Sequence, residues 1–241
     1  MKNLLGSIFF LLFLLPTSLL SSEPKTNNQK VKIDIVSDVV CPWCAIGYKR
    51  LSNAIDELHV RDRVEIVWHP YELNPDMPKE GQNADEYQRN KFGIDEKKVM
   101  EKRKKVTQTG EESGFKFDYF AEMQKVNTLN AHILLAYAKK HNKQTELKVR
   151  LQEAYFGERK NISNREVLYN ELKAVGLNAD EAITKLDNED DIKHVRDEEK
   201  YWKDKREVFA IPTMFFNDDI EEIGARKQEE YKALLKELLD L

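Results

Sequence analysis

The chain has 241 residues, enough for one domain with a sizeable core or one domain that carries a large insertion. Charged residues make up 34% of it and the net charge is −4, so we expect a soluble protein with long solvated helices. The sequence has no basic stripe interleaved with aromatic residues, so nothing in it favours a nucleic-acid partner.

Residues 1–22 differ from the rest of the chain. A basic residue precedes an apolar run over residues 4–15, which is shorter than the ~20 residues of a membrane-spanning helix. This pattern predicts a secretory signal peptide and an exported protein, periplasmic or secreted. Cleavage after Ser22 would place Leu20 where a small residue is preferred, so an uncleaved membrane anchor is the alternative. Residues 23–30 are predicted to form a disordered linker.

A strand–helix–strand unit follows this segment. Residues 31–38 alternate β-branched and polar side chains, which predicts a strand. Residues 45–58 predict a helix, and residues 63–73 a second strand. The apolar positions of this helix are Ala45, Tyr48, Leu51, Ile55 and Leu58.

The middle of the chain, residues 75–206, is predicted to be an all-helical insertion. Ser163 and Glu166 form a predicted capping box, and Gly110 and Gly114 suit the end of a helix. The basic run over residues 102–105 is interpreted as a solvated helix face, with a binding patch as the alternative. Separate helices are expected over residues 84–93, 95–114, 127–142, 145–161, 164–176 and 178–190, and a charged segment to Arg206 completes the set.

The end of the chain returns to strands. Residues 211–217 and 219–225 predict two short strands joined in a β-hairpin by Asn217-Asp218-Asp219, and an amphipathic helix follows to the end. Without the helical insertion, the order β-α-β, β-β-α is that of a thioredoxin module. We therefore expect an α/β thioredoxin fold, built from residues 31–74 and 207–241.

The two cysteines of the chain, Cys41 and Cys44, lie between the first strand and the first helix. Pro42 suits the first helical position, so Cys41 is expected to be the N-cap residue. The N–H groups of Trp43 and Cys44 and the helix dipole would then favour the Cys41 thiolate, and cysteine pKa values at such sites fall to about 3.5–7.5. We predict that Cys41 is the attacking thiol and Cys44 the resolving thiol.

Two other interpretations of the cysteine pair are weaker. A disulfide across two residues closes a very short loop, so it restrains little of the unfolded chain. A structural zinc site needs four ligands, and the five histidines show no paired ligand spacing. We expect no metal and no bound cofactor, because the dithiol itself carries two electrons.

Several segments together resemble DsbA-type thioredoxin-fold oxidoreductases, specifically the FrnE branch. They are SDVVCPWCAIGYKRL, HPYELNPDMPKEG, NTLNAH, EAYFGERKNIS, IPTMFF and EIGA, and the resemblance runs from about Val31 to Leu238. It implies a thioredoxin fold with a helical insertion and thiol–disulfide exchange. The expected partners are protein thiol or disulfide substrates and a redox-recycling partner that the sequence does not identify.

The resemblance also implies which residues surround the cysteines. Pro212 would be cis and face the pair, leaving the backbone groups of Ile211 free to hydrogen-bond a substrate strand. Asn127 and His132 match a helix that lies over the active site in the family. Asn127 is interpreted as a substrate-side residue or a helix cap, and His132 as a core histidine.

Trp43 and Asp38 belong to the motif and its approach. Trp43 is interpreted as a packing residue or as a groove wall that contacts substrate, rather than as a catalyst. Asp38 is interpreted as a proton relay for Cys44 or as a surface residue at the strand end. Strongly oxidising DsbA members carry histidine at the place of Trp43, and tryptophan supplies no charge to hold the thiolate. A less oxidising pair is therefore expected, near the middle of the range from about −270 to −120 mV.

Two alternative functions remain open at the sequence level. One is a glutathione-dependent isomerase or transferase of the hydroxychromene carboxylate isomerase or kappa class; these relatives usually carry serine where Cys41 stands. The other is a non-catalytic, chaperone-like module that holds unfolded chains on the basic helix.

Overall fold

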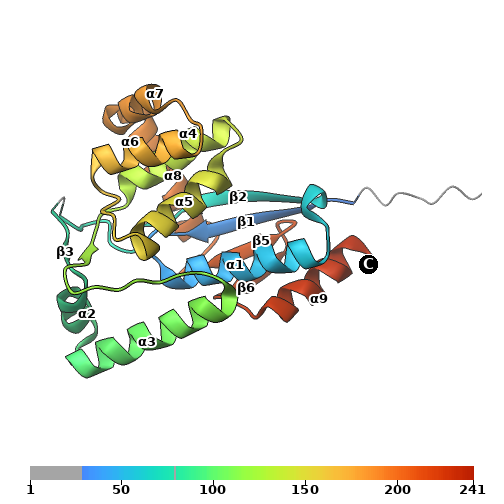
Figure 1. The fold of residues 1–241 in the computed structure, drawn as a ribbon. Helices are drawn as coiled ribbons and strands as arrows, with labels where there is room; N and C mark the ends of the chain where they lie inside the picture. The colour runs from blue at the N-terminus through green and yellow to red at the C-terminus, as the bar shows by residue number, and fades with distance from the viewer. Residues whose placement is uncertain (1–28, 79) are drawn as a thin grey trace, which may run out of the picture.

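The computed structural model describes residues 29–78 and 80–241, so the predicted signal peptide lies outside the described residues. A four-stranded sheet with the order β2-β1-β5-β6 occupies the centre (Figure 1). β1 pairs parallel with β2 and antiparallel with β5, which pairs antiparallel with β6. The predicted thioredoxin fold is confirmed. The strands are β1 (Val31–Ser37), β2 (Val64–Pro70), β5 (Thr213–Phe216) and β6 (Ile220–Ile223).

Helices α1 (Pro42–Glu57) and α9 (Gln228–Leu239) cover one face of this sheet (Figure 1). Ile33 and Ile35 of β1 pack there against apolar residues of both helices. The hairpin turns over residues 217–219, where Asn217 and Asp218 have positive φ values of 52° and 66° and the Asp219 N–H donates to the Phe216 carbonyl at 3.3 Å.

The helices of the insertion share one apolar core, which also includes Val39, Val40, Ala45 and Ile46 of the thioredoxin module. The last helix of the insertion returns to the sheet, where the rings of Trp202 and Phe215 lie 5.4 Å apart. No helix in residues 29–78 and 80–241 is long and apolar enough to cross a membrane. The helices are α2 (Ala84–Phe92), α3 (Glu96–Ser113), α4 (Leu129–Lys140), α5 (Gln144–Gly157), α6 (Arg165–Ala174), α7 (Ala179–Thr184) and α8 (Glu189–Asp204), with 3-10 turns at Arg61–Arg63 and Lys185–Asp187.

The insertion differs from the sequence-based expectation in two details. It contains a short antiparallel ribbon of β3 (Gln82–Asn83) and β4 (Gln124–Lys125), so it is not entirely helical. Strands of two residues have no alternation that a sequence pattern can reveal. The N-cap of α6 is Asn164 rather than Ser163, and its side-chain oxygen accepts from the N–H groups of the first turn.

Candidate active site

Cys41 occupies the N-cap position of α1, with Pro42 at the first helical position as expected. The Cys41 carbonyl accepts from the N–H groups of Cys44 at 3.1 Å and Ala45 at 3.3 Å. Its sulfur makes no capping hydrogen bond to the first turn, which differs from the predicted arrangement. Both cysteines are free thiols; the side chain of Cys41 reaches the surface slightly, whereas Cys44 is buried behind it.

The two thiols have opposite acidities. The Cys44 thiol, as hydrogen-bond donor, lowers the pKa of Cys41 although burial opposes this shift. The nearby Cys44 N–H and the Lys125 ammonium lower it further, whereas the charge of Asp38 raises it. Burial raises the pKa of Cys44 well above its ordinary value, and the Cys41 thiolate adds to this. Cys41 therefore ionises first.

The segment before β5 lies directly against Cys41. The Ile211–Pro212 peptide bond is cis, and Cys41 Sγ lies 4.0 Å from the carbonyl oxygen of Ile211. Within the described residues, the backbone N–H and C=O of Ile211 make no hydrogen bond with other backbone groups. Gly47 allows the close approach of α1, because a Cβ there would lie 3.3 Å from Pro212 Cγ. Ile211 thus presents two backbone groups without a backbone partner beside the sulfur.

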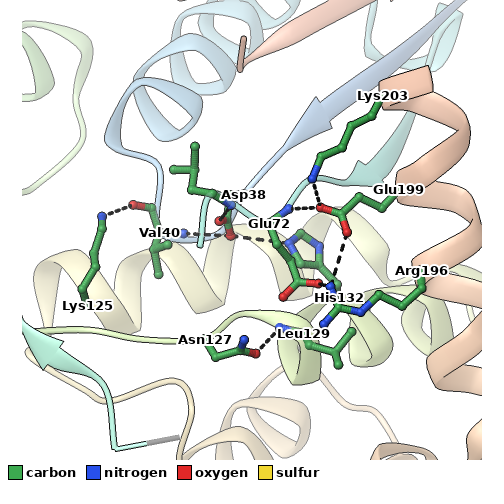
Figure 2. Close-up of polar contacts among 11 residues, drawn as sticks. Asp38, Val40, Glu72, Lys125, Asn127, Leu129, His132, Arg196, Glu199 and Lys203 are labelled. Carbon is green, nitrogen blue, oxygen red and sulfur yellow. Dashed lines mark hydrogen bonds and ion pairs between the residues drawn. The ribbon is translucent and has the colours of Figure 1, made fainter. Parts of the chain in front are cut away.

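Asp38 lies beneath the cysteine pair and is fully buried, so the interpretation as a surface residue is wrong. One of its oxygens accepts from the Leu73 N–H at 2.9 Å, and the other lies 3.4 Å from His132 Nε2 (Figure 2). Burial by itself would raise the pKa of Asp38, but the His132 imidazole and the Leu73 N–H hold it below its ordinary value. A buried, charged carboxylate therefore stands next to the dithiol.

Lys148 of α5 is a second buried charge at this place, and the sequence analysis missed it. Its side chain is 1% exposed, and its Nζ lies 5.1 Å from the centroid of the Trp68 ring. Burial lowers its pKa to about 8, although Cys44, Asp38 and Cys41 oppose this shift. The available sequence signal was a lysine on the buried stripe that also holds Leu151 and Tyr155.

The segment that follows β2 is held by contacts with α8 on one side and with Asp38 on the other. The N–H of Glu72 donates to Glu199 of α8 at 2.6 Å, and Arg196 forms an ion pair with the Glu72 carboxylate (Figure 2). Lys203 completes this cluster with a 2.7 Å contact to Glu199. Because Asp38 holds the Leu73 N–H, the next residue along, this segment forms a fixed wall beside the active site.

A cleft of 490 Å³ opens beside Cys41, between the motif and helices α2 and α3. Trp43 lines it, as predicted for a groove wall, and so does Ile211. It is also lined by side chains that the sequence analysis did not single out for the site. They are Leu73, Asn74, Tyr87, Gln88, Lys91, Phe92, Val106, Tyr119 and Lys125, with Lys102, Arg103 and Lys105 from the basic run.

Asn127 is not among the residues that line this cleft. Its side-chain oxygen accepts from the Leu129 N–H at 3.0 Å (Figure 2), and its nitrogen donates to the Pro75 carbonyl at 3.1 Å. These bonds hold the Asn127 side chain at the start of α4. Its contact with substrate stays a prediction. Within residues 29–78 and 80–241, no cluster of three or more His, Cys, Asp or Glu side chains is placed to hold a metal ion.

The fold and the paired cysteines place this protein in the thioredoxin-fold class. The chain belongs to the family of DSBA-like thioredoxin domains, which it matches over residues 32–236. It is 25% identical over 207 residues to the uncharacterized protein YwbO of Bacillus subtilis, covering 86% of this chain and 97% of YwbO.

Many solved structures share the fold, among them the following two. A probable DsbA oxidoreductase from Streptomyces coelicolor superposes with a TM-score of 0.80 at 22% identity, over 87% of this chain and 90% of that one. The cytosolic disulfide reductase DsbM from Pseudomonas aeruginosa, with GSH, superposes with a TM-score of 0.62 at 16% identity, over 87% of this chain and all (100%) of DsbM.

Proposed function

We propose that this protein is an extracytoplasmic thiol–disulfide oxidoreductase that exchanges disulfides with protein substrates through Cys41 and Cys44. The opposite acidities of the two thiols carry this proposal. A thiol with a lowered pKa at a helix N-terminus is a nucleophile, and a buried thiol behind it with a raised pKa is a resolving group.

The exchange proceeds in two steps that conserve atoms and electrons. The Cys41 thiolate attacks one sulfur of a substrate disulfide, forms a mixed disulfide and releases the other substrate sulfur as a thiolate. Cys44 then loses its proton and attacks Cys41 Sγ, which releases the second substrate thiolate. Two electrons pass to the substrate and the Cys41–Cys44 disulfide remains; the reverse sequence oxidises a substrate dithiol.

The acidity of Cys44 changes during this cycle. Once Cys41 is part of a mixed disulfide it carries no charge, so one cause of the raised Cys44 pKa disappears. Lys148, whose charge favours the Cys44 thiolate, stays in place. Cys44 therefore becomes a nucleophile only after substrate is bound, which limits premature reaction.

Single-cysteine variants test this proposal. Cys44→Ser should accumulate a mixed disulfide with a disulfide-containing peptide substrate, detected by intact-mass spectrometry, because no thiol resolves it. Cys41→Ser should form none under the same conditions. Equal trapping by both variants, or by neither, would contradict the assigned roles.

The alternative functions give different results in the same variants. A glutathione-dependent isomerase or transferase would keep activity towards a small glutathione adduct in Cys41→Ser while disulfide exchange is lost. A chaperone-like module would keep its ability to prevent aggregation of an unfolded protein in the Cys41→Ser/Cys44→Ser double variant. Loss of all function in the double variant supports exchange.

The proposed location rests on the pattern in residues 1–22. Fusion of residues 1–30 to an alkaline phosphatase that is active only after export tests it. Activity of the fusion supports export, and an inactive fusion with a stable cytoplasmic product contradicts it. The mass of the released protein shows whether the signal is cleaved.

A further inference from the structure

The cleft beside Cys41 carries charge of one sign. Its lining includes five cationic side chains and no aspartate or glutamate among the described residues. All five belong to the insertion, on α2, α3 and β4, whereas the sulfur belongs to the thioredoxin module. They are Lys91, Lys102, Arg103, Lys105 and Lys125.

Four of these five cations have no carboxylate partner among residues 29–78 and 80–241. Arg103 is the exception, since it pairs with Asp85 at 2.5 Å. Lys91 donates to the amide oxygen of Asn74 at 3.2 Å, and Lys125 to the carbonyl of Val40 at 3.3 Å. These neutral acceptors leave the positive charge uncompensated. Lys102 lies over the Phe92 ring, 4.5 Å from its centroid, and Lys105 makes no ion pair with a described residue.

Aromatic side chains lie between the cations. Trp43 and Tyr119 line the cleft together with Cys41, and Tyr87 and Phe92 line it from α2. Phe92 is 54% exposed, which is unusual for so large an apolar side chain. A polypeptide with alternating acidic and apolar side chains matches this combination in both charge and hydrophobicity.

We infer that this cleft selects client polypeptides that carry aspartate or glutamate next to the reacting cysteine. The inference rests on the proposed function, because it names the substrate class of the same site. A client strand hydrogen-bonded to Ile211 beside Cys41 lies at the edge of the cleft, so its neighbouring side chains face the lysines. The uncompensated cations attract carboxylates and repel basic flanking residues. The main effect is on the association rate, which rises for acidic clients and falls for basic ones.

Helix α3 provides both the variants and a matched control. Lys102 and Lys105 line the cleft, whereas Lys97 and Lys104 of the same helix do not. All four side chains are exposed, and none of them forms an ion pair with a described residue. Replacing either pair by glutamine, Lys102 with Lys105 or Lys97 with Lys104, removes the same net charge without disturbing the core. An effect that only the Lys102 and Lys105 replacements produce is therefore due to their position in the cleft and not to the change in net charge.

The test uses three synthetic peptides that contain the same disulfide and differ only in the two flanking residues, which are Asp, Asn or Lys. Reduced full-length protein is mixed with excess peptide, and thiol release is followed in a single turnover. At low ionic strength the Asp peptide should react about tenfold faster than the Lys peptide, and salt should reduce this ratio. Lys102→Gln/Lys105→Gln should bring the ratio towards one, while Lys97→Gln/Lys104→Gln should leave it unchanged.

The ratio between peptides is the relevant quantity, because a change in Cys41 acidity alters the rates of all three alike. Equal rates for the three peptides, or a ratio that survives in Lys102→Gln/Lys105→Gln, would overturn the inference while leaving the proposed function intact. Glutathione disulfide serves as a fourth substrate. If Lys102→Gln/Lys105→Gln slows only the reaction with glutathione disulfide, the cleft recognises a small anionic disulfide and the inference is wrong. If no disulfide reacts, the proposed function fails and the inference falls with it.

Discussion

His132 Nε2 lies 3.4 Å from Asp38 Oδ1, and both side chains are almost completely buried. Asp38 follows the first strand of the thioredoxin module, whereas His132 belongs to α4 of the insertion. The insertion therefore supplies part of the electrostatic environment of the cysteine pair. The charge of Asp38 opposes ionisation of Cys41, and His132 of the insertion helps to keep Asp38 charged by lowering its pKa.

Asp38→Asn should make Cys41 more acidic, because it removes a negative charge that raises the Cys41 pKa. We expect the pH midpoint of Cys41 alkylation by iodoacetamide to fall by about one unit. The introduced amide keeps an oxygen for the Leu73 N–H, so the backbone contact can persist. Asp62→Asn, at an exposed position, is the control. A midpoint that stays the same or rises would show that Asp38 is not coupled to Cys41.

Lys148→Met should slow the second step of exchange. The Lys148 charge lowers the Cys44 pKa, so its loss leaves less Cys44 thiolate at neutral pH, about tenfold less for each unit of pKa. We expect the mixed disulfide to persist longer in quenched-flow experiments, with little change in the rate of its formation. Lys140→Met, at an exposed position on α4, is the control. Unchanged lifetimes of the mixed disulfide would exclude this role of Lys148.

Lys148 should also change how the free energy of unfolding depends on pH. Burial lowers its folded-state pKa to about 8, from about 10.4 in an unfolded chain. Between these values the unfolded chain holds a proton that the folded chain has released, so the free energy of unfolding rises with pH. The wild type should gain about 3 kcal/mol relative to Lys148→Met across this interval. Urea titrations at several pH values measure the difference, and a constant difference would contradict the assignment.

The thioredoxin sheet and the cysteine pair could be predicted because their signals are local. Alternating β-branched residues mark β1, and a proline after Cys41 marks the start of α1. The burial of Asp38 could not be predicted, because the residues that cover it belong to α4 and α5, far along the chain. The charge pattern of residues 102–105 indicates a solvated face, yet three of the four residues line the cleft. That position depends on how α3 packs beside α1, which no local pattern reports.

Trp43→His should make the cysteine pair more oxidising. A histidine between the cysteines can donate to, or carry a positive charge near, the Cys41 thiolate, which stabilises the reduced form. Each 1.4 kcal/mol of such stabilisation raises the reduction potential by about 30 mV. A glutathione redox titration of both proteins measures the change. A potential that stays constant or falls in the variant would show that Trp43 does not limit the oxidising power of the pair.

Gly110→Ala should destabilise the protein, although alanine in a helix is normally about 1 kcal/mol better than glycine. The sequence pattern suggests Gly110 as a helix end, but α3 continues to Ser113 and ends at Gly114, whose φ is 80°. A Cβ at Gly110 would clash with the Phe117 ring and lie 2.8 Å from the Phe115 carbonyl oxygen.

Because backbone cannot move aside as a flexible side chain can, we expect a loss of about 1–3 kcal/mol in urea unfolding of Gly110→Ala. Gly157→Ala is the matched control, since a Cβ at Gly157 meets only an ordinary contact at 3.5 Å. Displacement of α3 should also weaken the selectivity for acidic peptides, because α3 carries Lys102 and Lys105. If Gly110→Ala proves as stable as Gly157→Ala, the packing of Phe117 on α3 does not fix this wall of the cleft.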